Sequence, residues 1–178
     1  MRLVILDRDG VINRESDDFI KSPAEWIPLP GSLEAITRLT KAGYTVVVAS
    51  NQSGVGRGLF SLEMLGKINA HMNAAVEKAG GKIDAVFVCP HKPEDGCDCR
   101  KPKPGLFTQI AARYGVSLKD VPAIGDAARD IEAARAAGAR PILVRTGRGA
   151  ALPKQLAGGV ETYADLAAAA EKLVRETS

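Results

Sequence analysis

The sequence predicts an α/β fold, in which a three-layer, Rossmann-like parallel sheet carries helices on both faces. Short apolar runs rich in β-branched residues alternate with amphipathic stretches of helical spacing, an alternation typical of parallel strands joined by covering helices. The first run, residues 3–6, leads directly into Asp7 and Asp9. A buried parallel strand would deliver these carboxylates to the carboxyl edge of the sheet, where open α/β sheets bind ligands.

Five strands and five helices are expected. The predicted strands are residues 2–6, 44–49, 83–88, 121–125 and 141–145, and the predicted helices are residues 32–42, 61–79, 105–114, 128–137 and 163–175. Residues that favour helix boundaries stand at several of these ends: Ser32 and Ser61 as N-caps, Pro104 in a first turn, and Gly43, Gly80 and Gly138 at helix ends. No internal repeat or long linker divides the chain, so we expect one domain over residues 1–178.

Composition excludes several classes of protein. Of the 178 residues, 46% are hydrophobic and 25% charged, as in ordinary globular proteins. The net charge of +3 and the aromatic content of 4% are too low to indicate nucleic-acid binding. No apolar stretch approaches the roughly 18–20 residues that cross a bilayer, and the first predicted strand leaves no room for a secretory signal. We expect a cytoplasmic monomer that binds a small molecule, and neither nucleic acid nor membrane.

The residues after the first strand favour a divalent cation. Asp7 and Asp9 are two apart, so on an extended strand their side chains project to the same side. Two carboxylates held together repel each other unless one is protonated or a cation lies between them. Mg²⁺ prefers such hard oxygen ligands and commonly accompanies phosphate chemistry. The sequence therefore predicts a magnesium site and chemistry on a phosphate.

Three further polar clusters follow predicted strands and should reach the same edge of the sheet. They are Ser50-Asn51, Arg100-Lys101 and Asp126, with Asp130 four residues later. Together they offer a hydroxyl, an amide, fixed cations and a further carboxylate, which is what positioning a transferring phosphoryl group requires. We expect Asp130 to cap a helix or orient a loop rather than to contact the metal.

Two loops are longer than the scaffold needs, and such loops are usually functional. The first is residues 10–30. The second, residues 89–104, holds four soft or borderline ligands within eleven residues: Cys89, His91, Cys97 and Cys99. Cys₃His is a set that binds structural Zn²⁺ in a closed tetrahedron, which we favour over a redox pair or three unrelated thiols. The other histidine, His71, is expected at the surface of a helix.

Four motifs carry a resemblance to the haloacid dehalogenase (HAD) superfamily of phosphatases. They are DRDGVIN at residues 7–13, SNQSG at 50–54, RKP at 100–102 and GDAARD at 125–130. Within the superfamily the chain most resembles the D,D-heptose 1,7-bisphosphate phosphatases, and next the related histidinol-phosphatases. The resemblance implies a HAD-like fold with a minimal cap and a zinc-binding loop.

The resemblance also implies roles for individual residues. Asp7 would be the nucleophile and Asp9 the general acid and base; Mg²⁺ would be held by Asp7, the Asp9 backbone carbonyl and Asp126. Ser50 and Lys101 would hold the phosphoryl oxygens, and Arg100 would help to bind the substrate. The substrate contacts expected on this basis are Glu15, Ser16, Asp17, Asp18, Ser50, Asn51, Gln52, Ser53, Arg57, Arg100, Lys101 and position 127. Position 127 is Ala127 here, where several relatives carry a longer or polar residue, and Arg57 lies in a glycine-rich segment, residues 54–58, expected to be a flexible turn.

The function implied is removal of the 7-phosphate of a heptose 1,7-bisphosphate through an aspartyl-phosphate, giving heptose 1-phosphate for lipopolysaccharide core biosynthesis. The anomer stays open. Hydrolysis of histidinol phosphate is the enzymatic alternative. A zinc-stabilised phospholigand- or nucleic-acid-binding module without catalysis is a third reading, against which the presence of both Asp7 and Asp9 argues.

Overall fold

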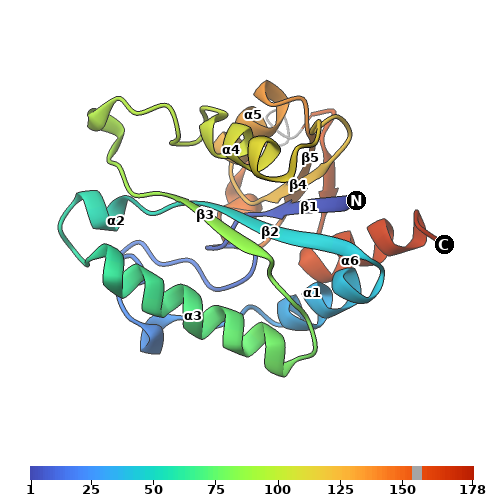
Figure 1. Ribbon diagram of the computed structural model, residues 1–178, viewed down its shortest axis with the longest axis horizontal. Coiled ribbons are helices and arrows are strands. Elements are labelled where there is room, and N and C mark those ends of the chain that lie inside the picture. Colours follow the sequence, from blue (N-terminus) through green and yellow to red (C-terminus); the bar gives the residue numbers. More distant parts are fainter. Residues whose placement is uncertain (154–157) are drawn as a thin grey trace.

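A six-stranded parallel sheet forms the centre of the structure, a computed structural model that describes residues 1–153 and 158–178 (Figure 1). Its strands run in the order β3-β2-β1-β4-β5-β6. Their bounds are β1 (Arg2–Leu6), β2 (Tyr44–Asn51), β3 (Ala85–Cys89), β4 (Pro122–Gly125), β5 (Arg140–Val144) and β6 (Glu161–Tyr163). Every adjacent pair is parallel. The predicted α/β class and the first five strands are confirmed, with ends shifted by at most two residues.

Helices cover both faces of this sheet, as predicted. In Figure 1, α1 (Ser32–Lys41), α3 (Leu62–Lys78) and α6 (Leu166–Arg175) lie on one side, and α4 (Gly105–Tyr114) and α5 (Ala128–Ala136) lie on the other. A one-turn helix, α2 (Ser53–Gly56), follows β2. Three short 3₁₀ segments complete the described elements: η1 (Pro23–Glu25), η2 (Pro93–Asp95) and η3 (Gly147–Ala151).

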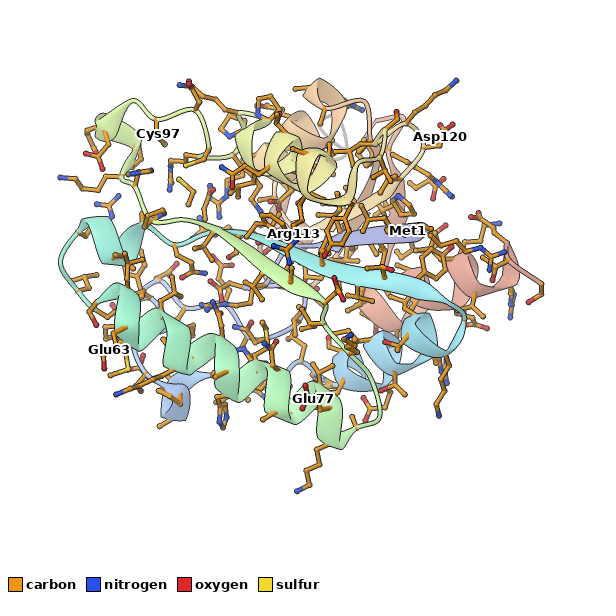
Figure 2. The ribbon with its side chains drawn as sticks, in the orientation of Figure 1. Met1, Glu63, Glu77, Cys97, Arg113 and Asp120 are labelled. Carbon is orange, nitrogen blue, oxygen red and sulfur yellow. The ribbon has the colours of Figure 1, made fainter. Side chains whose placement is uncertain are left out.

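The core is divided by the sheet into two aliphatic layers, because alternate strand residues point to opposite faces. In β1, Val4 and Leu6 pack with residues of α1, α3 and α6, whereas Leu3 and Ile5 pack with residues of α4 and α5. The outer sides of the helices carry charged residues; Figure 2 shows Glu63 and Glu77 along α3, where both are exposed. Within the described ranges, no helix combines the length and apolar character needed to cross a membrane.

Several predicted helix boundaries are confirmed. The Ser61 hydroxyl accepts a hydrogen bond from the Met64 backbone N–H at the start of α3. Gly43, Gly80 and Gly138 follow α1, α3 and α5 with φ values of +83°, +95° and +76°. This left-handed conformation is where a helix commonly ends, and glycine adopts it without strain.

Other local predictions are corrected. The N-cap of α1 is Gly31, and Ser32 instead donates its hydroxyl hydrogen to the Val11 carbonyl, 2.9 Å away. Pro104 is the N-cap of α4 rather than part of its first turn. The last helix starts at Leu166 with Asp165 as its cap, because residues 161–163 pair with β5 as the edge strand β6. That strand has only three half-buried residues, so it leaves no apolar run in the sequence.

The strand order explains where a site can form. The connection after β1 leads to one half of the sheet, β2 and β3, and the later strands build the other half outward from β4. At such a reversal of direction the loops that follow adjacent strands diverge and leave a crevice at the carboxyl edge. The end of β1 therefore lies between the ends of β2 and β4, which carry Asn51 and Gly125.

Candidate active site

Asp7 directly follows β1 and forms a buried ion pair with Lys101. The Lys101 Nζ lies 3.0 Å from Asp7 Oδ1 and 2.7 Å from Asp130 Oδ1, and it also donates to the Ala49 carbonyl at 2.8 Å. The Lys101 side chain is only 2% exposed. Three acceptors from three separate elements thus fix one ammonium group beside the Asp7 carboxylate.

Asp126 lies at the end of β4, where its surroundings leave little space. Its Oδ2 accepts a hydrogen bond from the Arg148 backbone N–H at 2.9 Å. A Cβ placed on Gly10 would lie 2.0 Å from this same oxygen, and one on Gly147 would lie 2.3 Å from it. Both positions have positive φ. Glycine is therefore required at both positions, because it lets two loops approach the carboxylate.

Asp130 has the capping position predicted for it. Its Oδ2 accepts hydrogen bonds from the backbone N–H groups of Asp126 and Ala127, at 3.1 and 3.0 Å, at the start of α5. Its other oxygen faces Lys101. Asp130 therefore fixes both the loop that carries Asp126 and the lysine beside Asp7.

Asp7, Asp126 and Asp130 bring carboxylate oxygens within 4.8 Å of one another. Burial and the charge of Asp130 raise the pKa of Asp7 to about 6 in spite of Lys101. Burial and the charges of Asp7 and Asp130 raise the pKa of Asp126 to about 8. Carboxylates forced together in this way are strained as anions, and a divalent cation relieves the repulsion. The donor set therefore fits Mg²⁺, and it contains Asp7 and Asp126, the two carboxylates expected to hold the ion.

Asp9 belongs to a different network. Its carboxylate accepts hydrogen bonds from Arg8 Nε at 3.0 Å, Asn13 Nδ2 at 2.8 Å and Gln52 Nε2 at 3.0 Å. Arg8 is fully buried and also donates to Asn69 of α3. Although burial opposes it, the Arg8 guanidinium with these hydrogen bonds lowers the pKa of Asp9. The predicted acid and base is thus oriented by three donors, of which the sequence interpretation did not identify Arg8 and Asn13.

The SNQSG segment contributes positioning contacts. Asn51 Nδ2 donates to the Lys101 carbonyl and Asn51 Oδ1 accepts from the Lys101 N–H, both at 3.0 Å. Gln52 Nε2 also donates to Ser50 Oγ at 2.8 Å, and Ser50 is fully buried. The Asn51 amide therefore holds the backbone that carries Lys101, whereas the Ser50 hydroxyl faces Gln52.

A cavity of about 250 Å³ opens over these groups. Ten of the predicted site residues line it: Asp7, Asp9, Glu15, Ser16, Asn51, Gln52, Ser53, Arg57, Arg100 and Lys101. Four lining residues were not predicted, namely Phe19, Ile20, Arg129 and Arg148. Phe19 and Ile20 lie in the first long loop, Arg129 lies within the GDAARD motif, and Arg148 lies in η3. Membership of a long loop or of a motif was therefore the sequence signal for the first three.

Four predicted substrate residues do not line this cavity. Asp17 and Asp18 are exposed, and Asp17 lies 3.7 Å from Arg148. Ala127 is buried at the N-cap of α5, and Ser50 lies beneath the surface of the site. The segment expected to be a flexible turn is partly helical, because residues 53–56 form α2; Arg57 directly follows it and lies 5.9 Å over the ring of Phe19.

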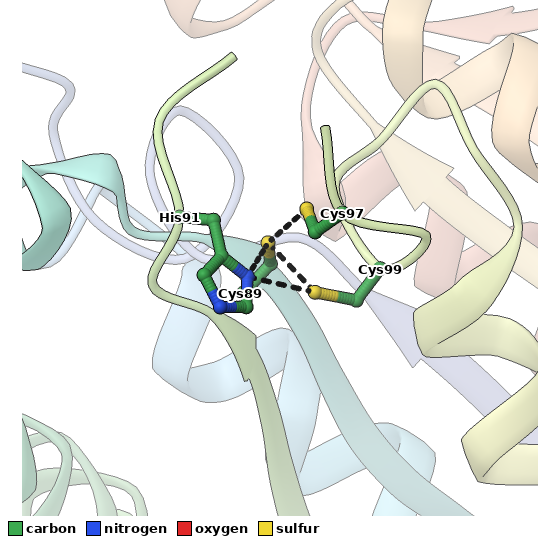
Figure 3. Close-up of side chains that lie close together, drawn as sticks. All are labelled: Cys89, His91, Cys97 and Cys99. Carbon is green, nitrogen blue, oxygen red and sulfur yellow. Dashed lines mark hydrogen bonds between the residues drawn. The ribbon is translucent and has the colours of Figure 1, made fainter. Parts of the chain in front are cut away.

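The four predicted zinc ligands lie close together at the end of β3 and in the loop that follows it. One of them, Cys97, is labelled in Figure 2. Figure 3 shows their side chains pointing toward one another. The Cys89 Sγ lies 3.5 Å from His91 Nδ1 and 3.6 Å from Cys97 Sγ, and His91 Nδ1 lies 3.3 Å from Cys99 Sγ. Although burial opposes it, hydrogen bonds from the Arg100 backbone N–H and from neighbouring thiols lower the pKa of Cys97 to about 7. Three thiols and one imidazole at this spacing fit a tetrahedral Zn²⁺.

Comparisons with known proteins agree with this geometry. A family model described as HAD-hydrolase-like matches residues 98–171. The chain is 55% identical over 178 residues to D-glycero-β-D-manno-heptose-1,7-bisphosphate 7-phosphatase of Bordetella bronchiseptica, covering 99% of both chains, and 51% identical to the enzyme of that name from Pseudomonas aeruginosa.

Solved structures give the same result. The crystal structure of D,D-heptose 1,7-bisphosphate phosphatase from B. bronchiseptica, complexed with magnesium and phosphate, superposes with a TM-score of 0.96 over 99% of both chains. The structure of D,D-heptose 1,7-bisphosphate phosphatase from Burkholderia thailandensis superposes with a TM-score of 0.75. It is 43% identical and covers 98% of this chain and 99% of its own. With the four motifs assembled at one sheet edge, the chain belongs to the D-glycero-D-manno-heptose 1,7-bisphosphate 7-phosphatase family of the HAD superfamily.

Proposed function

We propose that this protein is a Mg²⁺-dependent phosphatase that hydrolyses the 7-phosphate of D-glycero-β-D-manno-heptose 1,7-bisphosphate, leaving heptose 1-phosphate. The observation that carries the proposal is the position of Asp7, which lies at the cavity beside a fixed ammonium group and within reach of two further carboxylates. The relatives named above are heptose bisphosphate phosphatases, which favours this substrate over histidinol phosphate, and their names specify the β-anomer.

The reaction divides into two displacements at phosphorus. In the first, an Asp7 carboxylate oxygen forms a bond to phosphorus as the bond to the C7 oxygen breaks. Asp9 must enter this step protonated, although Arg8 favours its anion, and it gives the departing oxygen that proton. In the second, water attacks phosphorus, Asp9 takes a proton from that water, and the bond to Asp7 breaks to release inorganic phosphate. The hydrogen bonds from Arg8, Asn13 and Gln52 hold the Asp9 carboxylate in place for both transfers.

The charges of the site suit this sequence. Lys101 lies 3.0 Å from Asp7 Oδ1, so its ammonium group would be close to the negative charge that gathers on a phosphoryl group attacked by Asp7. Mg²⁺ held by Asp7, the Asp9 carbonyl and Asp126 would neutralise further charge on those oxygens. The Cys89, His91, Cys97 and Cys99 set would hold Zn²⁺ structurally, two residues before Lys101 in the sequence. The monomeric state and the cytoplasmic location stay predictions.

The test is phosphate release with Mg²⁺ from three compounds: the β- and α-anomers of the heptose bisphosphate, and histidinol phosphate. We expect the highest kcat/KM for the β-anomer. Preference for histidinol phosphate would retain the chemistry and replace the substrate. No release from any of the three would contradict the proposal.

The nucleophile is tested with Asp7→Asn. This variant should lose a factor of about 10³ or more in kcat while it keeps the fold, because removing one of three crowded carboxylates does not open the core. The matched control is Asp120→Asn, an exposed loop position, which should retain wild-type activity. Normal turnover by Asp7→Asn would exclude Asp7 as the nucleophile.

A further inference from the structure

Arg8 is a fully buried arginine next to the active site, and a helix far along the chain holds its charged end. Its side chain is 0% exposed, although an arginine is rarely buried without partners. It continues the alternation of Val4 and Leu6, which pack with the layer that contains α3. Its Nη1 donates a hydrogen bond to Asn69 Oδ1 of α3 at 3.1 Å. This contact links the end of β1 to a residue 61 positions further along the chain.

The rest of the Arg8 guanidinium faces Asp9. Its Nε lies 3.0 Å from Asp9 Oδ1, and its Nη2 lies 3.3 Å from Asp9 Oδ2. Asn13 and Gln52 each donate to only one of these oxygens. Over residues 1–153 and 158–178, Arg8 is the one residue whose side chain donates to both. A planar fork on both oxygens fixes the plane of a carboxylate, so the direction of Asp9 follows that of Arg8.

The direction of the guanidinium depends in turn on Asn69. Within the part of the chain that the structure describes, Asp9 and Asn69 are the only hydrogen-bond partners of this group. A buried donor without an acceptor is costly. If the Asn69 oxygen were removed, the guanidinium would turn to satisfy its freed N–H, and the Asp9 carboxylate would turn with it.

The place of Asn69 in the fold fits a supporting role. It is half-buried in the middle of α3, beside the apolar residues that face the core, where asparagine is less favourable to a helix than leucine or alanine. It does not line the active-site cavity. The helix that carries it is itself held, because the Trp26 ring packs edge to face on His71 of α3 with 5.6 Å between ring centroids. A side chain on such a helix is a rigid support.

We propose that Asn69 is a positioning residue for proton transfer: it holds the Arg8 guanidinium, which aims the Asp9 carboxylate at the departing sugar oxygen. The inference rests on the proposed function, in which Asp9 gives that oxygen a proton as its bond to phosphorus breaks. Proton transfer requires the two oxygens within hydrogen-bond distance, and a misplacement of about 1 Å costs about 10²-fold in rate. Asp7 has a separate support in Lys101, so loss of Asn69 should spare the attack on phosphorus.

The experiment compares two leaving groups in Asn69→Leu, which replaces the amide by an apolar side chain of similar size. Heptose 1,7-bisphosphate releases a sugar oxygen that must be protonated as it departs, whereas acetyl phosphate releases acetate, which is stable as an anion. For both substrates kcat/KM covers the steps up to the aspartyl-phosphate, so it reports the first displacement. Asn69→Leu should lower kcat/KM about 10- to 100-fold on the heptose bisphosphate. On acetyl phosphate it should lower kcat/KM less than about threefold.

The matched control is Asn73→Leu, the same change one turn later on α3. Asn73 is half-buried, and its Oδ1 has no hydrogen-bond partner among the described residues, so kcat/KM should stay within about twofold of wild type on both substrates. Asn69→Asp keeps an oxygen facing Arg8 and should recover most of the activity on the heptose bisphosphate. Equal losses on the two substrates in Asn69→Leu would overturn the inference, because Asn69 would then support Asp7 or the fold. No loss on either would overturn it as well.

Thermal unfolding shows whether each variant keeps the fold. If Asn69→Leu does not fold, Asn69→Ala replaces it, because its smaller side chain leaves room for a water molecule that satisfies the Arg8 N–H without fixing the guanidinium. The same loss confined to the heptose bisphosphate is then expected.

NMR tests the contact between Asn69 and Arg8 without any turnover. The Arg8 Nε–H signal of ¹⁵N-labelled protein should shift in Asn69→Leu, or in Asn69→Ala where that replaces it, and stay in place in Asn73→Leu. A signal that does not move in the Asn69 variant would overturn the inference. If wild type hydrolyses no heptose bisphosphate, the proposed substrate fails, whereas this signal still tests the contact. Histidinol phosphate, whose departing oxygen also needs a proton, then replaces the sugar in the kinetic comparison.

Discussion

The carboxylate–lysine cluster and the cysteine–histidine cluster are assembled in opposite ways. Asp7, Lys101, Asp126 and Asp130 come from three distant parts of the chain, and all are at least 90% excluded from solvent. The four soft ligands come from eleven consecutive residues, and only Cys89, at the end of β3, is buried. The first cluster needs the whole sheet to exist, whereas the second needs only one loop to fold back on itself.

This difference matters because the two clusters are joined. Arg100 and Lys101 directly follow Cys99 in the chain. A Cβ on Gly105 would lie 2.2 Å from the Asp98 carbonyl, so the loop also packs closely on the start of α4. The cysteine–histidine cluster thus holds one end of the segment that supplies the buried ammonium group of Lys101, and Asn51 holds the other side of that segment.

The largest effect is expected from Lys101→Met, which leaves two buried carboxylates without their cation. Breaking such a pair costs about 3–5 kcal/mol in the free energy of unfolding, and urea denaturation in magnesium-free buffer measures it. Turnover should be lost as well. Lys119→Met removes an exposed lysine and should change stability by less than about 0.5 kcal/mol. A fully stable Lys101→Met protein would show that the ion pairs are not structural.

Removal of zinc tests the second cluster. Cys97→Ser, or treatment with a zinc chelator followed by Mg²⁺, should increase hydrogen exchange over residues 89–104 and leave β1 and β4 protected. Activity should fall on the order of 10- to 100-fold, because Lys101 is held less accurately. Asp98→Ala changes an exposed side chain between two ligands and should retain zinc. A zinc-free protein with unchanged activity and exchange would refute the structural role.

Asn51→Ala tests the contact that joins the two clusters. It removes two hydrogen bonds to the Lys101 backbone, and we expect a loss of about 1–3 kcal/mol in stability with a smaller fall in kcat than in Lys101→Met. If the cysteine loop alone positions Lys101, kcat will not change. Comparing the kcat of this variant with that of Cys97→Ser measures how much Asn51 and the cysteine–histidine cluster each contribute to the position of Lys101.

The stability of the metal-free protein should also depend gradually on pH. The pKa values of Asp7 and Asp126 rise from 3.8 to about 6 and about 8 in the folded protein. Between the unfolded and folded values the native state binds more protons than the unfolded chain, so stability decreases as pH rises through this window. In magnesium-free buffer, Tm should fall between about pH 5.5 and about pH 8. Saturating Mg²⁺ should raise Tm more at about pH 8 than at about pH 5.5. An equal rise at the two pH values would contradict the assignment of the raised pKa values to repulsion among these carboxylates.

Much of the fold follows from local sequence patterns. The apolar run of residues 3–6 predicts β1 because a strand buried on both faces needs no alternation. Gly43 and Gly138 mark helix ends because few other residues tolerate positive φ. The edge strand β6 could not be predicted, since its three residues are held by pairing with β5 and not by their own propensity.

The sequence by itself determined which chemical groups are present and, through motif spacing, which of them share an edge of the sheet. It also determined the cysteine loop, whose ligands are neighbours in the chain. Only the tertiary structure decided that Arg8 and Asn13 orient Asp9, that Asn51 holds the Lys101 backbone, and that Arg129 reaches the cavity. Contacts between residues far apart in the chain depend on how helices and loops pack over the sheet, and no local pattern of residues encodes that packing.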